Sequence, residues 1–308
     1  MITVYKKKCG GFSGEPENCC NKLGETYMII TANKKEKKLA ALQMLQDIWN
    51  NKGLIKELAK NDFKKKFAGS YFGILWAFVS PIVTICVYWF VFTVGMRGQS
   101  GDVNGYPFVL WLIAGLVPWF LFSEIMNSGT NVLVEYTYLV KKIVFNISIL
   151  PIMKIVTATV IHLFFVVLMF AIFLLSGHTP DIYMLQIPYY MIALWILSAA
   201  CVFITSAIVV FFKDLTQVVN IFLQVFIWIT PIMWQDTAML ADHPVIAQII
   251  RLNPMYYIVR GYRDAMINHV WFWEDPGMTI YFWVVTILLF LLGSSTFNRL
   301  KPHFADVI

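Results

Sequence analysis

The residues best suited to chemistry are cations that gather in three short stretches of the chain. These are Lys64, Lys65 and Lys66, then Lys141 and Lys142, and finally Arg251, Arg260 and Arg263. Cationic side chains bind phosphates and carboxylates, so each stretch could hold an anionic ligand. The lysine run could attract an anionic lipid headgroup, or it could simply anchor a helix at a membrane surface. The arginines could equally form ordinary ion pairs with Asp264, Glu274 or Asp275.

The elements that carry these residues must form in a bilayer. The chain has 308 residues, of which 59% are hydrophobic and only 14% are charged, and its mean hydropathy is +0.67. Soluble proteins are less apolar, so this composition excludes a soluble enzyme, a disulfide scaffold and a disordered tail. The net charge of +6 is too small and too little patterned for a protein that binds nucleic acid.

Six stretches are free of charge over the length that a membrane helix needs, which is about 20 residues. The charge-free stretches are 67–96, 103–123, 155–180, 182–212, 215–235 and 278–298. We expect the spans themselves near residues 71–96, 106–126, 152–176, 186–212, 215–235 and 278–298. Pro81 lies inside the first span, where we expect it to kink the helix rather than end it. The sequence therefore predicts an all-α polytopic membrane protein, with a six-helix transmembrane domain over residues 70–308.

The positive charges are distributed unevenly over the connecting segments. With the amino terminus inside, 20 of the 24 Lys and Arg residues fall on the cytoplasmic side, and Arg97, Arg251, Arg260 and Arg263 fall outside. Because lysine and arginine collect in cytoplasmic segments, we expect a multi-pass protein of a plasma membrane with both termini in the cytoplasm. No apolar segment of a cleavable signal peptide precedes the first span, so we expect that span itself to direct insertion.

Two segments precede the first span. Residues 1–38 form a polar leader rich in Gly, Cys and Lys, and we expect translation to begin naturally at Met28. Residues 39–69 place apolar side chains at helical spacing with lysines between them, which predicts a basic amphipathic helix on the inner leaflet. We expect this interfacial helix to break at Gly53.

A second amphipathic helix is predicted over residues 132–147, between spans two and three. Its apolar face contains Val132, Tyr136, Leu139, Val140, Ile143 and Ile147. Its other faces carry Glu135, Tyr138, Lys141 and Lys142. The helix could lie at the membrane surface, or it could be the surface against which a cytoplasmic motor domain pushes.

The outward segment between spans five and six contains apolar runs that are too short to cross the membrane. We expect two helices within residues 244–268, separated by Asn253, which suits an N-cap, and Pro254, which suits the first helical position. The pair could form a re-entrant hairpin, which a bilayer tolerates only where protein or water surrounds it. It could also lie flat on the outer surface.

Aromatic side chains could line a path through the protein. The faces of Trp and Tyr stack on sugar rings and would hold a polymer loosely, and Trp76, Trp228 and Trp234 are candidates for this role. The alternative is that these residues anchor helices at the membrane interfaces or pack between helices.

Motifs for catalysis, metal binding and nucleotide binding are absent from the sequence. There is no Gly-x-x-x-x-Gly-Lys-Ser/Thr phosphate loop, no Asp-x-Asp pair, no His-Glu-x-x-His zinc pair and no Gly-x-Ser-x-Gly elbow. The charge-free stretches contain one ionisable group of note, His162, which we interpret as a hydrogen-bonded structural residue rather than a proton relay. We therefore expect no catalytic residue, metal or cofactor on this chain, and any energy for transport must come from a partner ATPase.

Several strings match a known family in order and spacing from about residue 40 to the carboxyl end. They include Gly73-Ile-Leu-Trp-Ala-Phe-Val-Ser-Pro81, Ala114-Gly-Leu-Val-Pro-Trp-Phe120, Thr230-Pro-Ile-Met-Trp234 and Leu252-Asn-Pro-Met-Tyr-Tyr-Ile-Val259. The sequence resembles the permease subunits of ABC-2-type polysaccharide exporters, most closely the teichoic-acid-translocation permeases of Gram-positive bacteria. The choice of teichoic acid over O-antigen or capsule rests on residues 253–263 and on the last residues.

The resemblance implies a homodimer in a bacterial plasma membrane that binds two separate ABC ATPase subunits, which hold ATP and Mg²⁺. The cargo would be a polymer on undecaprenyl diphosphate, most closely wall teichoic acid, moved from the inner to the outer leaflet among membrane lipids. The ATPase would dock on a coupling helix at 132–147 through Glu135, Tyr136, Tyr138, Lys141 and Lys142. The lipid headgroup would enter past Lys64, Lys65 and Lys66, and the outer gate would contain Arg251, Arg260, Arg263, Tyr256 and Tyr257.

Other interpretations stay open at this point. Within polysaccharide export, O-antigen or capsular polysaccharide is the alternative cargo. A polytopic membrane enzyme acting on lipid-linked sugars would work without an ATPase and would use outward residues such as Asp242, His243, Arg260 and His269. An ABC-2 exporter of a drug or small lipid would have no use for a long aromatic path.

Overall fold

The structure, a computed structural model, describes residues 40–67, 72–95, 103–141, 146–179, 181–236 and 242–307. These residues are almost entirely helical, and the one extended feature within them is an isolated bridge between Val103 and Tyr106. The all-helical class predicted from the sequence is therefore confirmed. The leader 1–38, its expected start at Met28, and Lys142 lie outside the described residues.

Six apolar helices lie in the stretches that we expect to span the membrane. They are α4 (Leu75–Trp89), α5 (Phe108–Thr130), α8 (Ile149–Leu175), α9 (Ile187–Val209), α10 (Leu215–Ile229) and α14 (Pro276–Leu300). By length and composition, four helices of the described part could cross a bilayer: α5, α8, α9 together with the preceding η2 (Ile182–Gln186), and α14 with its continuation. The helix α10 is shorter, at about 22 Å against a hydrocarbon core of about 30 Å. The helix α4 has the same length, but a π-helical segment, η1 (Phe90–Gly95), continues it without a break. The count of six spans therefore stays a prediction.

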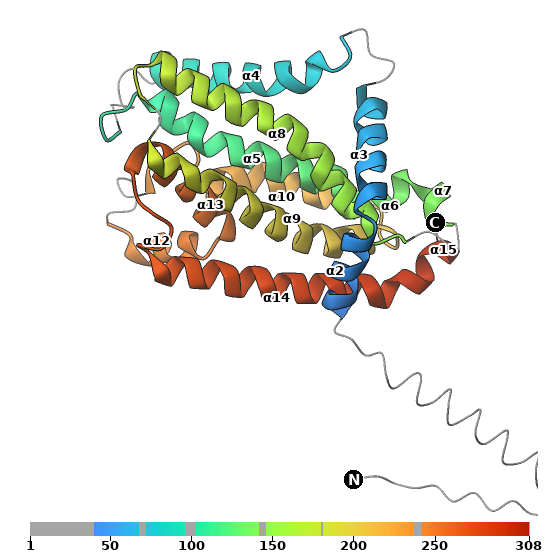
Figure 1. The fold of residues 1–308 in the computed structure, drawn as a ribbon. Helices are drawn as coiled ribbons and strands as arrows, with labels where there is room; N and C mark the ends of the chain where they lie inside the picture. Colours follow the sequence, from blue (N-terminus) through green and yellow to red (C-terminus); the bar gives the residue numbers. More distant parts are fainter. Residues whose placement is uncertain are drawn as a thin grey trace, which may run out of the picture. The chain divides into compact units, whose positions relative to one another are not determined.

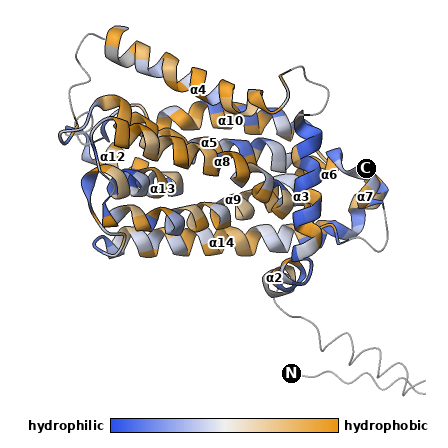
Figure 2. Cartoon of the chain, turned by 45° about the horizontal axis from the view of Figure 1, so that its top comes forward, coloured by the Kyte–Doolittle hydropathy of each residue, from blue (hydrophilic) through white to orange (hydrophobic). Residues whose placement is uncertain are grey.

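The bundle is built around α5 and α9, whose side chains are buried along most of their length. In Figure 1, α8 runs along α5 and α14 runs along α9. The helices α9 and α14 come closest at Gly293, where an added Cβ would lie 2.6 Å from the carbonyl oxygen of Ala200. The helix α4 lies at the edge of the bundle, and Figure 2 shows that it is mainly hydrophobic whereas α3 (Lys52–Phe67) is hydrophilic.

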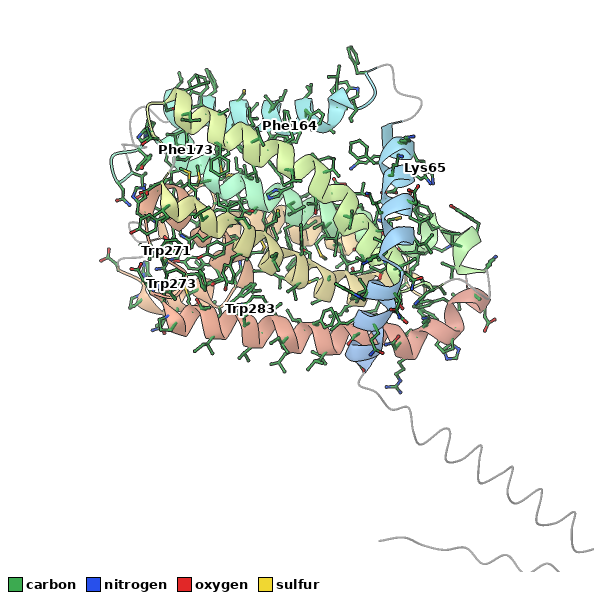
Figure 3. The ribbon with its side chains drawn as sticks, viewed as in Figure 1. Lys65, Phe164, Phe173, Trp271, Trp273 and Trp283 are labelled. Carbon is green, nitrogen blue, oxygen red and sulfur yellow. The ribbon has the colours of Figure 1, made fainter. Side chains whose placement is uncertain are left out.

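The segments that connect the apolar helices lie at two opposite ends of the bundle. One end, here called the inner end, contains α3, α6 (Val132–Glu135), α7 (Thr137–Val140) and α15 (Phe304–Val307) (Figure 1). The other, here called the outer end, contains α12 (Pro244–Arg251) and α13 (Pro254–Arg263), and the stacked rings of Trp271 and Trp273 also lie there (Figure 3). This grouping agrees with the expected topology, and the orientation of the two ends in the membrane stays a prediction.

The interfacial helix breaks at a different residue from the one predicted. The helices α2 (Ala40–Asn50) and α3 are separated at Asn51, and Gly53 lies inside α3. The side-chain amide of Asn51 donates to the carbonyl oxygen of Asp47 at 2.7 Å. Asparagine side chains compete with the backbone for hydrogen bonds and so favour helix ends, which explains why Asn51 and not the glycine marks the break.

The segment predicted as one helix over 132–147 is instead two short turns, α6 and α7, which meet at Tyr136. Tyr136 leaves the helical conformation, with φ −104° and ψ 35°, and its hydroxyl donates to the Asp62 carboxylate at 2.7 Å. A buried tertiary contact therefore overrides the amphipathic pattern at this residue. We refer to residues 132–141 as the coupling segment.

The fifth apolar helix ends earlier than predicted, at Ile229 rather than near residue 235. Thr230 is extended, with ψ 127°, and the residue after it is Pro231. Proline disfavours the helical conformation for the residue that precedes it, which accounts for the early end.

Two helices extend beyond the charge-free stretches that the sequence delimits. The helix α5 continues through Glu124, and α8 begins early enough to contain Lys154. Each of these charges has a partner of opposite sign on α3: Lys66 for Glu124, and Asp62 for Lys154. Pairing offsets the cost of placing a charge in an apolar helix, so the helices do not have to end there.

Candidate functional site

A hollow of about 580 Å³ lies between α4, α5 and α10, and we refer to it as the groove. The side chains that line it are Tyr88 from α4, Trp119, Ser123 and Asn127 from α5, and Gln217, Asn220, Leu223, Gln224, Ile227 and Trp228 from α10. None of these residues is charged. The groove therefore offers hydrogen bonds and aromatic faces without a site where a charged ligand would be held tightly.

Amide side chains give the groove its polar character. Gln217, Asn220 and Gln224 are spaced so that they share one face of α10, and Asn127 of α5 lines the same hollow. Within the described residues, none of these four side-chain amides has a hydrogen-bond partner. An amide offers two donors and one acceptor, which suits the hydroxyl and acetamido groups of sugars. At membrane depth such free groups require water or a polar ligand.

Aromatic rings form the other component of the groove. Trp228 is 56% exposed and Trp119 is buried beside it, in contact with Phe226. The indole N–H of Trp234 donates to the backbone carbonyl of Trp228 at 2.8 Å, so Trp234 supports the groove without lining it. Of the three tryptophans that we expected on a polymer path, Trp228 lies in the groove and Trp76 lines a separate hollow.

The amides of the groove were missed by the sequence analysis, although a signal for them exists. Polar residues that recur at three- and four-residue intervals within an otherwise apolar helix form a polar stripe, and Gln217, Asn220 and Gln224 have that spacing. On the neighbouring helix, Asn127 and Asn131 show a four-residue interval. This pattern is easily overlooked because none of these amide side chains is charged.

A second polar cavity, of about 580 Å³, lies at the outer end. It brings together Arg251, Arg260, Arg263 and Tyr256, which are four of the five residues expected at the outer gate. The fifth, Tyr257, lies elsewhere, where its hydroxyl is 2.9 Å from that of Tyr189 and 3.1 Å from that of Thr279. The expected N-cap at Asn253 is confirmed, because its side chain accepts a hydrogen bond from the Met255 amide at 2.8 Å.

The two helices of the outer segment have different environments. The helix α13 is buried against α5 and α9, whereas α12 has no buried residue. The arrangement with both helices flat on an outer surface therefore does not describe α13. Whether the pair is re-entrant in the membrane stays a prediction.

Arg263 is fixed in place by the protein itself. Its guanidinium donates to the carbonyl oxygens of Pro231 at 2.6 Å, Ile232 at 2.7 Å and Trp111 at 3.4 Å, and it lies 3.3 Å from the centre of the Trp111 ring. Gly115 makes room for it, because a Cβ there would lie 2.7 Å from Nη2. Arg263 thus joins α13 to α5 and to the turn after α10.

The other two arginines of the outer cavity differ in their availability. Arg260 forms ion pairs with Asp264 at 3.4 Å and Asp275 at 3.1 Å, so the ordinary pairing that we considered is confirmed for it. Arg251 is exposed, and no ion pair in the described part of the chain involves it. Arg251 is therefore the arginine of this cavity that is free to meet an anion from outside.

A network of charges joins three elements at the inner end, and in it Lys154 and Asp62 are buried whereas Glu135 is exposed. The Lys154 ammonium of α8 lies 2.7 Å from the Asp62 carboxylate of α3 and 2.8 Å from the Glu135 carboxylate of α6. Tyr136 donates to Asp62, and burial together with this carboxylate raises the pKa of the Tyr136 hydroxyl well above its usual range. Lys65 lies 3.5 Å from Glu135 and 4.9 Å from the centre of the Tyr136 ring (Figure 3).

The network changes which side chains are free to dock a partner. Glu135 and Tyr136 are engaged within the protein, whereas Tyr138 is 58% exposed and Lys141 is exposed beside it. Of the lysines expected near the lipid headgroup, Lys64 is exposed, Lys65 contacts Glu135, and Lys66 is paired with Glu124. These roles stay predictions: Glu135, Lys65 and Lys66 are exposed but form ion pairs within the protein, whereas Tyr136 is buried.

His162 is a buried structural residue, as expected, with its Nε2 atom 3.0 Å from the Tyr262 hydroxyl. The residues proposed for a membrane enzyme do not converge on one cavity. Arg260 lines the outer cavity, whereas His269 lies 3.6 Å from Asp181, and His243 lies at the exposed start of α12.

Comparison with protein families assigns the chain. The model of the ABC-2 type transporter family matches residues 53–267. The chain belongs to this family. As a membrane subunit of an ABC-2 transporter, it is expected to work with an ABC ATPase partner, in agreement with the absence of a phosphate-binding loop in its own sequence.

Three curated relatives of this ABC-2 transporter subunit carry the same name, O-antigen export system permease protein RfbA. The protein from Myxococcus xanthus is 26% identical over 267 residues, which cover 87% of this chain and all of the relative. Two proteins from Klebsiella pneumoniae are 26% and 28% identical and cover 83% of this chain and 95% of each relative. The expected family is confirmed, and these relatives agree with the alternative cargo, O-antigen, rather than specifically with teichoic acid.

Proposed function

We propose that the chain is the permease subunit of an ATP-driven exporter that moves a lipid-linked polysaccharide from the inner to the outer leaflet of a bacterial plasma membrane. The observation that carries this proposal is the uncharged groove with four free amides and the exposed indole ring of Trp228. A drug or small-lipid exporter has no need of such a surface. The names of the relatives favour an O-antigen polysaccharide as cargo.

Wall teichoic acid is the second candidate cargo. The strings at residues 252–263 and at the carboxyl end resemble the teichoic-acid permeases, as described above. Both polymers are carried on a diphosphate lipid, and a bare diphosphate cannot cross hydrocarbon because of its desolvation cost. A hydrated groove would suit either lipid-linked polymer, so contacts with the polymer's own repeat unit must distinguish O-antigen from teichoic acid.

The proposal includes a second copy of the chain and two ABC ATPase subunits that hold ATP and Mg²⁺. The groove is open on one side, and α4 and α10 expose large apolar residues around it, among them Val83, Val87, Phe222 and Val225. A second copy that covers these faces would close the groove into a path between protomers. On the inner end, Tyr138 and Lys141 form the exposed surface for the ATPase, through which ATP binding would displace the coupling segment.

The test uses the permease purified with the ATPase encoded beside it. We expect a stable complex whose ATP hydrolysis is stimulated by lipid-linked O-antigen glycan, and more weakly by a teichoic acid precursor. Asn220→Leu with Gln224→Leu should remove most of the stimulation, because both amides line the groove. Val284→Leu, at a 51% exposed position of α14 that does not line the groove, is the control. A chain that forms no such complex, or that responds equally when both amides are lost, would refute the proposal.

A further inference from the structure

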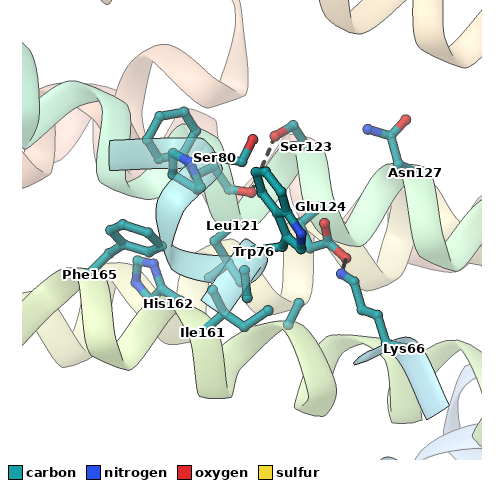
Figure 4. A pocket seen from close by; sticks show the side chains of 14 residues that line it. Lys66, Trp76, Ser80, Leu121, Ser123, Glu124, Asn127, Ile161, His162 and Phe165 are labelled. Carbon is teal, nitrogen blue, oxygen red and sulfur yellow. Dashed lines mark hydrogen bonds and ion pairs between the residues drawn. The ribbon is translucent and has the colours of Figure 1, made fainter. Parts of the chain in front are cut away.

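A third hollow, of about 330 Å³, lies on the other side of α5 from most of the groove. Trp76 and Ser80 of α4, Glu124 of α5 and His162 of α8 line it, and Lys66 reaches it from the end of α3 (Figure 4). Ser123 and Asn127 line both this hollow and the groove. The two hollows are therefore neighbours under α4. We refer to this one as the α4 cavity.

The charges of the α4 cavity cancel. Lys66 and Glu124 form an ion pair, and each side chain remains more than a third exposed. Only one oxygen of Glu124 is used in that pair, and no described residue donates to the other. An anionic group such as a phosphate would meet a carboxylate and a lysine that is already neutralised, so the cavity does not suit an anion.

The rest of the lining is mainly apolar, but it includes the groups that a sugar site needs. The indole of Trp76 is 52% exposed and forms one wall, while Glu124, Asn127 and the Ser80 hydroxyl bring polar groups to the same space (Figure 4). A sugar ring presents an apolar face that stacks on indole and hydroxyl groups that donate to a carboxylate. The volume lies at the lower end of the range for small-molecule sites, about 300–1,000 Å³, which leaves room for one ring and not for a chain.

A purely structural role explains the cavity less well. A buried or half-buried ion pair contributes little net stability, and an apolar pair of similar size would hold α3 against α5 at least as well. A carboxylate in a helix apolar enough to span a membrane is costly and is usually tied to function. Here it stands beside an exposed indole and next to the groove.

We propose that the α4 cavity binds a single neutral or amino sugar of the lipid-linked glycan, beside the groove at the inner half of the bundle. This inference rests on the proposed function and adds to it a second sugar subsite with its own recognition residues. Glu124 and Asn127 accept and donate hydrogen bonds to the sugar, and Trp76 stacks on its face. Lys66 holds the carboxylate in place and does not collect a headgroup.

The test is photo-cross-linking in the complete permease–ATPase complex loaded with its lipid-linked glycan. A benzoylphenylalanine is placed at Ala77 in the α4 cavity, at Ile227 in the groove, or at Val79, which is 40% exposed and lines neither hollow. We expect glycan adducts from positions 77 and 227 and none from 79. Adding Glu124→Gln should lower the yield at 77 by about tenfold, the effect of weakening hydrogen bonds to a charged group, and leave the yield at 227 unchanged.

The outcomes separate this inference from the proposed function. Adducts at 227 but not at 77 would overturn the sugar subsite and leave the exporter proposal standing. Adducts at neither position would count against both. An equal yield at 79 and 77, or a yield at 77 that ignores Glu124→Gln, would also overturn the subsite. Unchanged labelling at 227 in the Glu124→Gln protein shows that this variant is folded.

Discussion

Lys154 at the inner end and Arg263 at the outer end are both cations that are only 6% exposed, yet the protein satisfies them in opposite ways. Lys154 is neutralised by the carboxylates of Asp62 and Glu135, which come from two other elements. Arg263 is held by three backbone carbonyls and the face of an indole ring. Lys154 joins its elements through side-chain ion pairs, which can break and form again. Arg263 joins its elements through hydrogen bonds to backbone carbonyls.

The difference indicates what each end is built to do. Ion pairs between side chains of separate helices can exchange partners, so the inner network can pass a displacement of the coupling segment to α3 and α8. The carbonyls that bind Arg263 belong to the turn after α10 and to α5, whose positions are set by their own backbone. We therefore expect the inner end to move with the ATPase and the outer end to hold α13 rigidly. At each end the exposed cations, Lys141 and Arg251, remain for partners and cargo.

The largest effect is expected from breaking the inner pair. Lys154→Leu leaves the Asp62 carboxylate, which is 3% exposed, buried without a counter-charge. We expect the free energy of unfolding to fall by about 3–5 kcal/mol. Chemical denaturation of the purified protein in detergent micelles measures this change.

Two further variants show whether the pair itself is responsible. Lys64→Leu, at an exposed lysine of α3, should change the free energy of unfolding by less than about 0.5 kcal/mol. Removing both charges in Lys154→Leu with Asp62→Asn should recover most of the loss, because no unpaired buried charge remains and the amide oxygen can still accept from the Tyr136 hydroxyl. A double variant no more stable than Lys154→Leu would show that the loss does not come from the unpaired Asp62 carboxylate. That result would contradict the role of the ion pair at the inner end.

Adding a single methyl group at Gly115 tests whether Arg263 needs its position at the outer end. Gly115→Ala places a Cβ 2.7 Å from Nη2 of Arg263, so the guanidinium must shift against the carbonyls that hold it. We expect a loss of about 1–3 kcal/mol, as for other overpacked sites. The matched control is Gly53→Ala, where nothing lies within 4 Å of the added Cβ and the substitution should be neutral or slightly stabilising. Equal behaviour of the two alanine variants would mean that Arg263 does not need its present position.

We expect Lys141, an exposed cation of the inner end, to affect the coupling of ATP hydrolysis to transport and not the stability of the fold. Lys141→Glu reverses a charge on the surface proposed for the ATPase, and we expect transport per ATP hydrolysed to fall by about fivefold to tenfold. Glu135→Lys should instead destabilise the protein, because it replaces the carboxylate beside Lys154 and Lys65 with a third positive charge. Parallel assays of denaturation and of ATP-driven export distinguish the two. If Lys141→Glu left coupled transport unaffected, the ATPase would have to dock on a different surface.

The smallest effect is expected from the exposed cation of the outer end. Arg251→Gln should change the free energy of unfolding by less than about 0.5 kcal/mol, because the side chain makes no ion pair with a described residue. If Arg251 meets the diphosphate at the exit, the export rate should still fall, and it should fall more at low ionic strength, where charges are screened least. An export rate equal to the wild type at every salt concentration would remove Arg251 from the exit.

The fold was predictable wherever apolar length decides the structure. The six apolar helices, the N-cap at Asn253 and the gathering of Arg251, Arg260 and Arg263 near one another all follow from local sequence. Helix ends were predicted less well where a partner from a distant element intervenes. Glu124 and Lys154 stay inside helices because α3 supplies their counter-charges, which no local pattern reveals.

The candidate site was predictable only in part, for a related reason. Charged residues are easy to identify as candidates in a sequence. In the structure some of them, such as Arg260, form ion pairs within the protein, and others, such as Lys141 and Arg251, are exposed without such a pair among the described residues. Asn127 on α5 meets Gln217, Asn220 and Gln224 on α10 only in the folded protein. The stripe on α10 could have been read from its spacing, whereas its meeting with α5 and α4 could not.

The central claim is that the groove carries the glycan, and export into sealed vesicles tests it most directly. The permease and its ATPase are reconstituted with radiolabelled lipid-linked O-antigen glycan, and the ATP-dependent appearance of label on the opposite side is followed. We predict transport by the wild type and by Val284→Leu, and its near loss in Asn220→Leu with Gln224→Leu while the complex stays assembled. Wild-type transport after both groove amides are removed would contradict the account.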